Sequence, residues 1–432
     1  MTGPLWETLP KGWREGRIKN AATVTLGKML QTKNSGSDVI APYMRAANVQ
    51  PDGALALDSV NEMWFGEPEL EQLDLRAGDA VVVEGGQGGF GRAAYMAEDL
   101  PGWGFQNSII RLRPHRGFDG RFIAYYLIAL RASGFIRAYA NAVSMPHLTA
   151  DKLAKTPLLL PPLDEQRAIA DYLDRETARI DILIGEQERL IEMLRERRHA
   201  LRVNAAVYGT AHVSQVDSPL PWARQLPAHW GVVPLTAVAQ LESGHTPSRT
   251  REDWWTDTYI PWVSLHDVGN MQGIKYLNDT AQHISDAGIA NSSARLLPAR
   301  TVVLSRDATV GRTAIMGVPM ATSQHFAAWV CGPLLDPEYL WVLFADAMQP
   351  FFGSFQNGST IRTIGMGDLK AFRIPLPPLG EQRQIVKFLD QETPKIDAIM
   401  AQSERFIELS KERRAALITA AVTGQVDVRT AA

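Results

Sequence analysis

PPLDEQRAIADYLDRETARID, residues 161–181, recurs later in the chain as PPLGEQRQIVKFLDQETPKID, residues 377–397. Displaced by 216 positions, residues 160–201 and 376–417 are identical at 23 of 42 positions. Self-similarity on this scale is the signature of an internal repeat. The chain is therefore a tandem of two similar halves, and its function has to use two copies of something.

Composition sets broad limits on the class of protein. The 432-residue chain is 45% hydrophobic, enough for about two to four domains with sizeable cores. Its one cysteine, Cys331, excludes an intramolecular disulfide framework and fits a reducing compartment. The longest apolar run, residues 122–130, is too short to span a bilayer, and the first residues show no secretion signal. We expect a soluble cytoplasmic protein.

Each half begins with a block of mixed character. The blocks start with Leu-Pro-x-x-Trp, at residues 9–13 and 226–230, and continue through short β-rich runs and many Gly, Pro and Asn turns. This pattern predicts an α+β or barrel-like domain dominated by antiparallel pairing. The mixed blocks repeat only weakly: residues 81–96 can be laid on residues 302–316, sharing a Gly-Arg pair.

A helical block follows each mixed block. Pro-Pro at 161–162 and 377–378 ends the preceding strand, since proline cannot donate to a ladder. A short helix is expected over about residues 164–175, and its repeat over about residues 380–391.

A second, longer helix is predicted after a break in each helical block. Thr393-Pro394 has the form of an N-cap followed by proline at the first helical position, and the same break is expected at Thr177. The long helices are expected to run to about Tyr208 and Thr423, each stopped by a glycine.

Apolar residues follow each long helix in a narrow stripe, at steps of three and four, while the remaining positions are largely charged. Such a stripe predicts a coiled-coil seam and an antiparallel pairing of the two helices. The alternative is two unrelated amphipathic helices, each packed on its own domain. The predicted seam residues are Ile180, Leu183, Leu190, Leu194, Leu201, Ile396, Ile399, Phe406 and Leu417.

Motifs for catalysis are absent or unconvincing. The stretch Gly86-Gln-Gly88-Gly-Phe-Gly91 matches a dinucleotide fingerprint, but the second half keeps only the last glycine and no long helix follows Gly91. No Asn-Pro-Pro-aromatic methyltransferase loop occurs, and Asp368-Leu-Lys370 is the only nuclease-like tripeptide. The nine histidines lack metal-ligand spacing. We expect a non-catalytic chain without a metal site.

The distribution of charge says more than the net charge of −3, which neither indicates nor excludes nucleic acid. Residues 58–84 hold eight acids against Arg76, whereas residues 85–137 hold seven arginines against three acids. In the second block Arg295, Arg300, Arg306 and Arg312 stand against Asp307 alone. Arginine suits phosphate anchoring and bidentate guanine contact, and neighbouring amides suit adenine edges. The bland alternative is a solvated, ion-paired face.

These features together resemble the specificity subunit of Type I restriction–modification systems. The resemblance rests on Pro-Pro-Leu-x-Glu-Gln-Arg present twice, on the closing KERRAALITAAVTGQVDV at residues 411–428, and on the alternation of variable and constant blocks. It spans nearly the whole chain. Ser243-Gly-His-Thr-Pro-Ser-Arg249 is also similar to a loop common near the start of such domains, whereas the first half departs from it at residues 26–34.

The resemblance implies two target recognition domains, each reading one half of a split double-stranded DNA sequence, on an antiparallel coiled coil that fixes their distance. It also implies two methyltransferase subunits as partners, with restriction subunits joining later. S-adenosylmethionine, ATP and magnesium would be bound by those partners, and this chain would need no cofactor. The domains would be residues 1–160, 161–209, 210–376 (with a linker at 210–229) and 377–432.

Candidate DNA contacts follow from the arginine excess, the amides and the loop at 243–249. The runner-up is a scaffold without DNA, in which two ligand-binding domains sit on a coiled-coil strut; a steep fall of DNA binding with salt would discriminate the two. For Arg92 and Arg312, which share the Gly-Arg position, we expect a DNA-facing placement. The candidates are Gln87, Arg92, Gln106, Asn107, Arg111, His245, Arg249, Arg306, Arg312, Gln324, Asn357 and Arg362.

Overall fold

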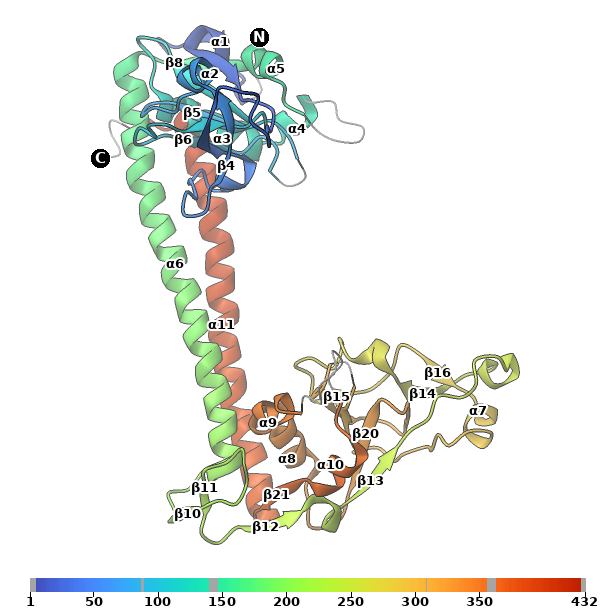
Figure 1. Ribbon diagram of the computed structural model, residues 1–432. Helices are drawn as coiled ribbons and strands as arrows, with labels where there is room; N and C mark the ends of the chain where they lie inside the picture. The colour runs from blue at the N-terminus through green and yellow to red at the C-terminus, as the bar shows by residue number, and fades with distance from the viewer. Residues whose placement is uncertain (1–4, 87–88, 140–146, 308, 356–362, 429–432) are drawn as a thin grey trace. The chain divides into compact units, whose positions relative to one another are not determined.

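The computed structural model describes residues 5–86, 89–139, 147–307, 309–355 and 363–428 (Figure 1). The chain divides into two compact units: Met1–Glu188 with Glu404–Ala432, and Arg189–Ser403. Each unit contains one mixed α+β domain and parts of both long helices. The predicted fold class is confirmed.

The first mixed domain is built on a four-stranded antiparallel sheet in the order β2-β8-β5-β6, with a three-stranded sheet in the order β4-β3-β7 beside it. Strand β3 pairs antiparallel with β4 and parallel with β7. A separate antiparallel pair, β1-β9, links the start of the domain to its end. The strands are β1 (Arg14–Arg17), β2 (Ala22–Leu26), β3 (Asp38–Met44), β4 (Asn61–Gly66), β5 (Ala80–Val83), β6 (Ala93–Tyr95), β7 (Gly104–Phe105), β8 (Ile109–Pro114) and β9 (Pro157–Leu160).

Strand β5 is buried on both faces, which explains its unbroken apolar sequence. Ala80 and Val82 pack into one cluster with helix α3 (Gly120–Ala132), whereas Val81 and Val83 pack into another with β3 and β4. Side chains along a strand alternate between faces, so one strand contributes to two cores. The remaining short helices are α1 (Ile18–Ala21), α2 (Glu67–Gln72), α4 (Phe135–Tyr139) and α5 (Ala150–Lys155).

The second mixed domain repeats this scaffold. Its main sheet runs β13-β20-β17-β18-β15, so its first four strands keep the order and antiparallel pairing of β2-β8-β5-β6. A three-stranded sheet, β16-β14-β19, and the pairs β12-β21 and β10-β11 complete it. The strands are β10 (Gln215–Asp217), β11 (Gln225–Pro227), β12 (Gly231–Pro234), β13 (Ala239–Ser243), β14 (Ile260–Val263), β15 (Tyr276–Leu277), β16 (His283–Ile284), β17 (Val302–Ser305), β18 (Thr313–Met316), β19 (Ala321–Thr322), β20 (Phe326–Cys331) and β21 (Arg373–Leu376).

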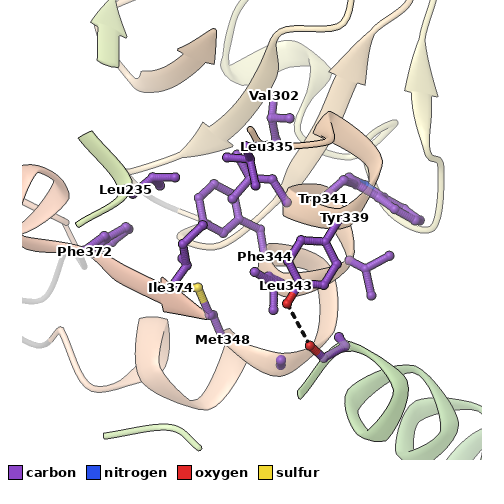
Figure 2. Packing of buried hydrophobic residues seen from close by; sticks show 14 of the residues in the cluster. Leu235, Val302, Leu335, Tyr339, Trp341, Leu343, Phe344, Met348, Phe372 and Ile374 are labelled. Atoms are coloured by element: carbon purple, nitrogen blue, oxygen red, sulfur yellow. Dashed lines mark hydrogen bonds between the residues drawn. The ribbon is translucent and has the colours of Figure 1, made fainter. Parts of the chain in front are cut away.

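A large aromatic core holds the second domain together (Figure 2). Phe344 and Phe372 pack edge to face, with ring centroids 6.4 Å apart. The fully buried Tyr339 donates its hydroxyl hydrogen to the carbonyl of Ala206, 3.0 Å away near the end of a long helix. This bond gives the buried phenol hydroxyl a hydrogen-bond partner, which it would otherwise lack away from water. The helices here are α7 (Asp286–Ala290), α8 (Pro337–Val342), α9 (Gln349–Gly353) and α10 (Met366–Ala371), with a π-helical turn at Leu343–Ala347.

The two long helices, α6 (Leu163–Tyr208) and α11 (Leu379–Val422), are each continuous. The predicted break into a short and a long helix at Thr177 and Thr393 is therefore wrong. Proline removes one backbone donor, but Pro394 lies inside α11 without ending it. Buried positions on both sides of it, Leu389 and Ile396, favour continuation because packing outweighs the local propensity.

The helices pair antiparallel, as a repeated ion pair demonstrates. In the first unit Arg414 lies 2.9 Å from Asp181, and in the second unit Arg198 lies 2.6 Å from Asp397. Because an early residue of one helix meets a late residue of the other, the pairing direction is fixed. The predicted antiparallel pairing is confirmed.

The seam, however, lies partly one residue away from its predicted position. Ile180, Leu194 and Ile396 are buried as predicted, and Leu190, Leu201 and Leu417 are partly buried. Leu183, Ile399 and Phe406 are instead 44%, 46% and 41% exposed. The buried heptad positions are Ile180, Ile184, Ile191 and Leu194 on α6, and Ile396, Met400, Ser403, Ile407 and Ser410 on α11.

The repeated Pro-Pro-Leu-x-Glu-Gln-Arg motif has a structural use in both units. The buried Gln166 donates to the carbonyl of Pro161 at 2.8 Å and accepts from the backbone N–H of Asp119 at 3.0 Å. Gln382 does the same with Pro377 and Asp336, at 2.8 Å each. Each glutamine thus ties the start of a long helix to the N-cap of a domain helix, α3 or α8.

Candidate nucleic-acid interface

A tightly anchored loop follows the first sheet strand of each mixed domain, residues 27–31 after β2 and residues 244–249 after β13. A Cβ atom added to Gly27 would overlap the backbone of Gln106, and one added to Gly244 would overlap the carbonyl of Thr322. Only glycine allows so close an approach. The two anchored loops therefore share one geometry, although their sequences differ from the next residue on.

In the second domain, the anchored loop lies beside a chain of polar side chains. The hydroxyl of Thr246 donates to Gln324 Oε1 at 2.6 Å, and Gln324 Nε2 lies 3.4 Å from His325 Nε2. His325 Nδ1 lies 2.8 Å from a carboxylate oxygen of Asp307. His245 is exposed, while its backbone N–H donates to the carbonyl of Thr322 at 3.0 Å. The structure thus brings together the predicted residues His245 and Gln324.

Arg306, also a predicted contact, braces this cluster. Its Nε donates to the carbonyl of Ile364 at 3.0 Å, and its backbone N–H donates to the carbonyl of His325 at 3.0 Å. The side chain is half-buried. Arg306 therefore connects its own loop to the loops that contain His325 and Ile364. Since, within the described residues, only Nε of the guanidinium takes part, its other nitrogens can still contact a ligand.

The first domain builds the corresponding edge differently. Glu84 and His147 pair at 3.0 Å, and an isolated bridge joins Gly85 to His147 as another joins Asp307 to Thr363. The predicted residues Gln106 and Asn107 are half-buried in the turn between β7 and β8. The backbone N–H of Asn107 donates to the carbonyl of Lys28 at 2.7 Å, which places this turn against the anchored loop.

Met29 and Leu30 on that loop are 75% and 51% exposed. They follow Gly27 much as Thr246 and Pro247 follow Gly244. The first domain therefore presents apolar side chains where the second presents a hydroxyl.

Arg111 is not available for the predicted DNA contact. Its side chain is 6% exposed, and Nη1 donates to the carboxylate of Asp74 at 2.9 Å and to the carbonyl of Gln72 at 3.1 Å. Burial, together with the charge of Arg113, lowers the pKa of Arg111. Asp79, 2% exposed, pairs with Arg113 at 2.7 Å. Part of the arginine excess is therefore internal ion pairing, as the bland alternative held.

Arg92 and Arg312 occupy corresponding clefts, each between a mixed domain and the long helices of its own unit. The first cleft, about 610 Å³, is also lined by Arg131, Lys411 and Arg414. The second cleft, about 450 Å³, is lined by Arg312 and several groups on α6, namely Arg195, Arg198, His199 and Arg202.

Neither Gly-Arg arginine is shown in an ion pair with an acid in the described part of the chain. Arg92 Nη1 donates to the carbonyl of Val49 at 3.3 Å, and Arg312 Nη2 donates to Gln272 at 3.2 Å. The local acid Asp307 pairs with His325 instead. Both arginines thus remain candidates for an external anion.

Arg249 is the most strongly positioned of the exposed candidates. Its guanidinium carbon lies 4.6 Å from the ring centre of Trp255 and 5.7 Å from that of Trp262. Nη2 donates to Gln282 Oε1 at 3.0 Å. No sequence pattern indicates Trp255 or Gln282, because their approach to Arg249 depends on the folded chain.

The remaining sequence predictions concern three further candidate residues, the glycine-rich stretch, metal sites and membrane-spanning helices. Gln87, Asn357 and Arg362 lie outside the described residues. The glycine-rich stretch lies between the antiparallel strands β5 and β6, and its residues 87–88 are outside the described part of the chain. Among the residues the structure describes, no group of three or more His, Cys, Asp or Glu is placed to hold a metal ion. No helix in the same residues has the length and apolarity needed to cross a bilayer.

Comparisons with known proteins point in one direction. The family model described as "Type I restriction modification DNA specificity domain" matches twice, at residues 10–192 and 227–409. The MjaIX specificity subunit of a Type I restriction enzyme from Methanocaldococcus jannaschii is 27% identical over 189 residues. That match covers 44% of this chain and spans less than half, 43%, of the relative.

Two solved structures share the fold. A chain from a study of complex assembly and conformational transition of the type I R-M system matches with a TM-score of 0.74 and 19% identity, covering 97% of this chain and 100% of that one. The HsdS subunit from Thermoanaerobacter tengcongensis matches with a TM-score of 0.59 and 22% identity, covering 97% and 99%.

Proposed function

Because the chain belongs to the family defined by the Type I restriction modification DNA specificity domain, we propose that it is the DNA-recognition subunit of a restriction–modification complex. Each mixed domain reads one half of a bipartite double-stranded DNA target. The domains are hereafter called the first and second recognition domains. Two DNA-binding surfaces of moderate size, linked in one chain, together give a higher sequence specificity than either surface alone.

One observation carries the proposal. The two recognition domains share strand order and a glycine-anchored loop, yet the side chains at the edge beside that loop differ in chemistry. Met29 is exposed in the first, whereas Thr246 and Gln324 form a bond in the second. A common scaffold with a variable edge is what reading two different half-sites requires.

The antiparallel helices act as the spacer between the half-sites in this proposal. Buried heptad positions and the repeated Arg–Asp pair make a helix pair stiffer than a flexible linker. The exposed apolar residues of the helices, among them Leu183, Ile399 and Phe406, leave surface for the two methyltransferase subunits to dock.

In this proposal, DNA methylation and cleavage are carried out by the partner subunits. We assign no catalytic residue, metal or cofactor to this chain, and place S-adenosylmethionine, ATP and magnesium on the methyltransferase and restriction subunits. The whole complex acts where the chromosome lies, in the cytoplasm of a prokaryotic cell.

Methylation mapping of DNA from cells that carry the whole system tests the proposal. The expected result is a split motif with two specified halves and an unspecified spacer of constant length. A continuous motif would contradict the two-domain assignment.

The salt dependence of DNA binding provides a second test. As salt rises from 50 to 200 mM, the affinity of the purified complex for DNA is expected to fall by about a thousandfold or more if 6–10 phosphates are contacted. Absence of DNA binding, or DNA binding that does not fall as salt rises, would favour the scaffold alternative.

A further inference from the structure

The second recognition domain contains two arginine–tryptophan stacks. The arginine of one stack is paired with an acid, whereas the arginine of the other is hydrogen-bonded to a neutral amide. Arg251 stacks over Trp254 at 5.2 Å and makes two hydrogen bonds to Asp253, at 3.1 and 2.9 Å. Arg249 stacks over Trp255, and its guanidinium donates to the neutral Gln282. Within the described residues, Arg249 is shown in no ion pair, so its charge is left for a ligand.

The platform under Arg249 is bound to the loop that carries it. The indole N–H of Trp255 donates to the carbonyl of Ser248 at 3.1 Å, and that of Trp262 donates to the carbonyl of His245 at 3.2 Å. Trp262 is 2% exposed, and the two rings meet edge to face at 5.5 Å. The loop and its stacking surface are therefore joined by two hydrogen bonds and an aromatic contact.

Such a support removes much of the side-chain entropy that an exposed arginine would lose on binding. The ring stack fixes the plane of the guanidinium, and Gln282 takes one of its five N–H donors. The remaining donors form an oriented edge. An oriented edge suits bidentate recognition of a guanine, whereas a phosphate can also be held by a lysine acting as a point charge.

The surroundings favour a neutral ligand edge over a phosphate track. Residues 249–259 contain two arginines and three acids, Glu252, Asp253 and Asp257. Acids repel the fully charged phosphate backbone more strongly than a base edge, which carries no net charge. The first recognition domain has no arginine in residues 27–31 of its anchored loop, so the feature is not common to both halves.

We propose that Arg249, held by Trp255 and Gln282, reads one guanine in the half-site bound by the second recognition domain, through O6 and N7 in the major groove. The inference rests on the proposed function and assigns one residue of this chain to one base pair. Trp255 and Gln282 act as positioning residues.

The test uses this chain assembled with its methyltransferase subunits and duplexes that carry the mapped motif. Each G·C pair of the half-site read by the second domain is replaced in turn, and binding is measured by competition. Arg249→Ala is expected to weaken binding to the intact motif about ten- to a hundredfold. It should also abolish discrimination at one G·C pair, while discrimination at every other position stays. Trp255→Ala should shift the same position in the same direction.

Two variants distinguish the alternatives. Arg249→Lys keeps the charge without the planar fork, so base reading predicts a loss close to that of Arg249→Ala, while a phosphate contact predicts little loss. Arg251→Ala, whose charge Asp253 already neutralises, serves as the matched control and should leave the motif unchanged. Equal weakening on all sequences, or an unchanged motif in Arg249→Ala, would overturn the inference. If the wild-type complex binds no DNA, the proposed function itself fails.

Discussion

The two recognition domains agree in their interior and disagree at one edge. Both place an antiparallel four-strand core in the same order and both press a glycine against a neighbouring turn, at Gly27 and Gly244. At the edge beside these glycines, one domain exposes Met29 and the other bonds Thr246 to Gln324. Core side chains must interlock, whereas edge side chains contact solvent or ligand and change without cost to the fold.

A histidine–carboxylate pair at each edge makes the same point. In the first domain His147, from the segment before α5, lies 3.0 Å from Glu84. In the second domain His325, from the turn between β19 and β20, lies 2.8 Å from Asp307. The two acids follow corresponding strands, but the histidines come from different places in the chain. Similar local chemistry has therefore been assembled twice by different routes.

The largest expected effect comes from exchanging a whole domain. Replacing residues 13–160 with the corresponding block of a related subunit should change one half of the methylated motif completely and leave the other intact. The physical reason is that each domain has its own cores and its own edge. Methylation mapping of cells with the hybrid complex gives the result. A change in both halves would contradict independent reading.

The shared helix pair is tested by two neighbouring substitutions. Ile407→Asp places a charge at a position 8% exposed and should lower the free energy of unfolding by about 2–5 kcal/mol. Phe406→Asp, at a position 41% exposed, should cost less than about 1 kcal/mol. Urea unfolding of the full chain measures both. The reverse ranking would return the seam to the register expected from the sequence.

The repeated glutamine offers a test of equivalence between halves. Gln166→Leu and Gln382→Leu each leave buried backbone groups unsatisfied, which should cost about 1–3 kcal/mol in the unit concerned. The neighbouring exposed Arg167→Ala is the control and should be close to neutral. Hydrogen exchange resolves which unit loses protection. A large effect in only one half would show that the clamp is not shared.

The smallest expected effect concerns the two Gly-Arg positions. Arg92→Ala and Arg312→Ala are each expected to weaken DNA binding on all sequences alike and to reduce the salt slope by about one unit, because a phosphate contact is sequence-independent. Binding of specific and scrambled duplexes at two salt concentrations provides the measurement. An unchanged slope would leave these residues as lining of the clefts beside the helices.

Part of the candidate site could be predicted from sequence because its chemistry is local. The loop that carries His245 and Arg249 is recognisable by its similarity to a loop of the resembled family, and Gln324 by the chemistry of its amide. Arg111 was misjudged because its partner Asp74 lies 37 positions earlier in the chain and reaches it only in the fold. The platform formed by Trp255 and Gln282 was missed for the same reason.

The seam shows where local pattern stops being informative. Leu183 and Ile184 are both apolar, as are Ile399 and Met400, so steps of three-then-four and four-then-three both trace apolar stripes. Only the partner helix decides which of two neighbours is covered, and it covers Ile184 and Met400. The break expected at Pro394 failed similarly, because a single missing donor is outweighed by packing along the rest of the helix.

Local sequence patterns are enough to predict a duplicated α+β protein with two long paired helices, since repeats, periodicity and turn residues are properties of neighbouring positions. The helix register, the burial of Arg111 and the support of Arg249 emerge only in the folded protein. These depend on residues distant in the chain, whose burial and contacts are set by the folded packing rather than by local pattern.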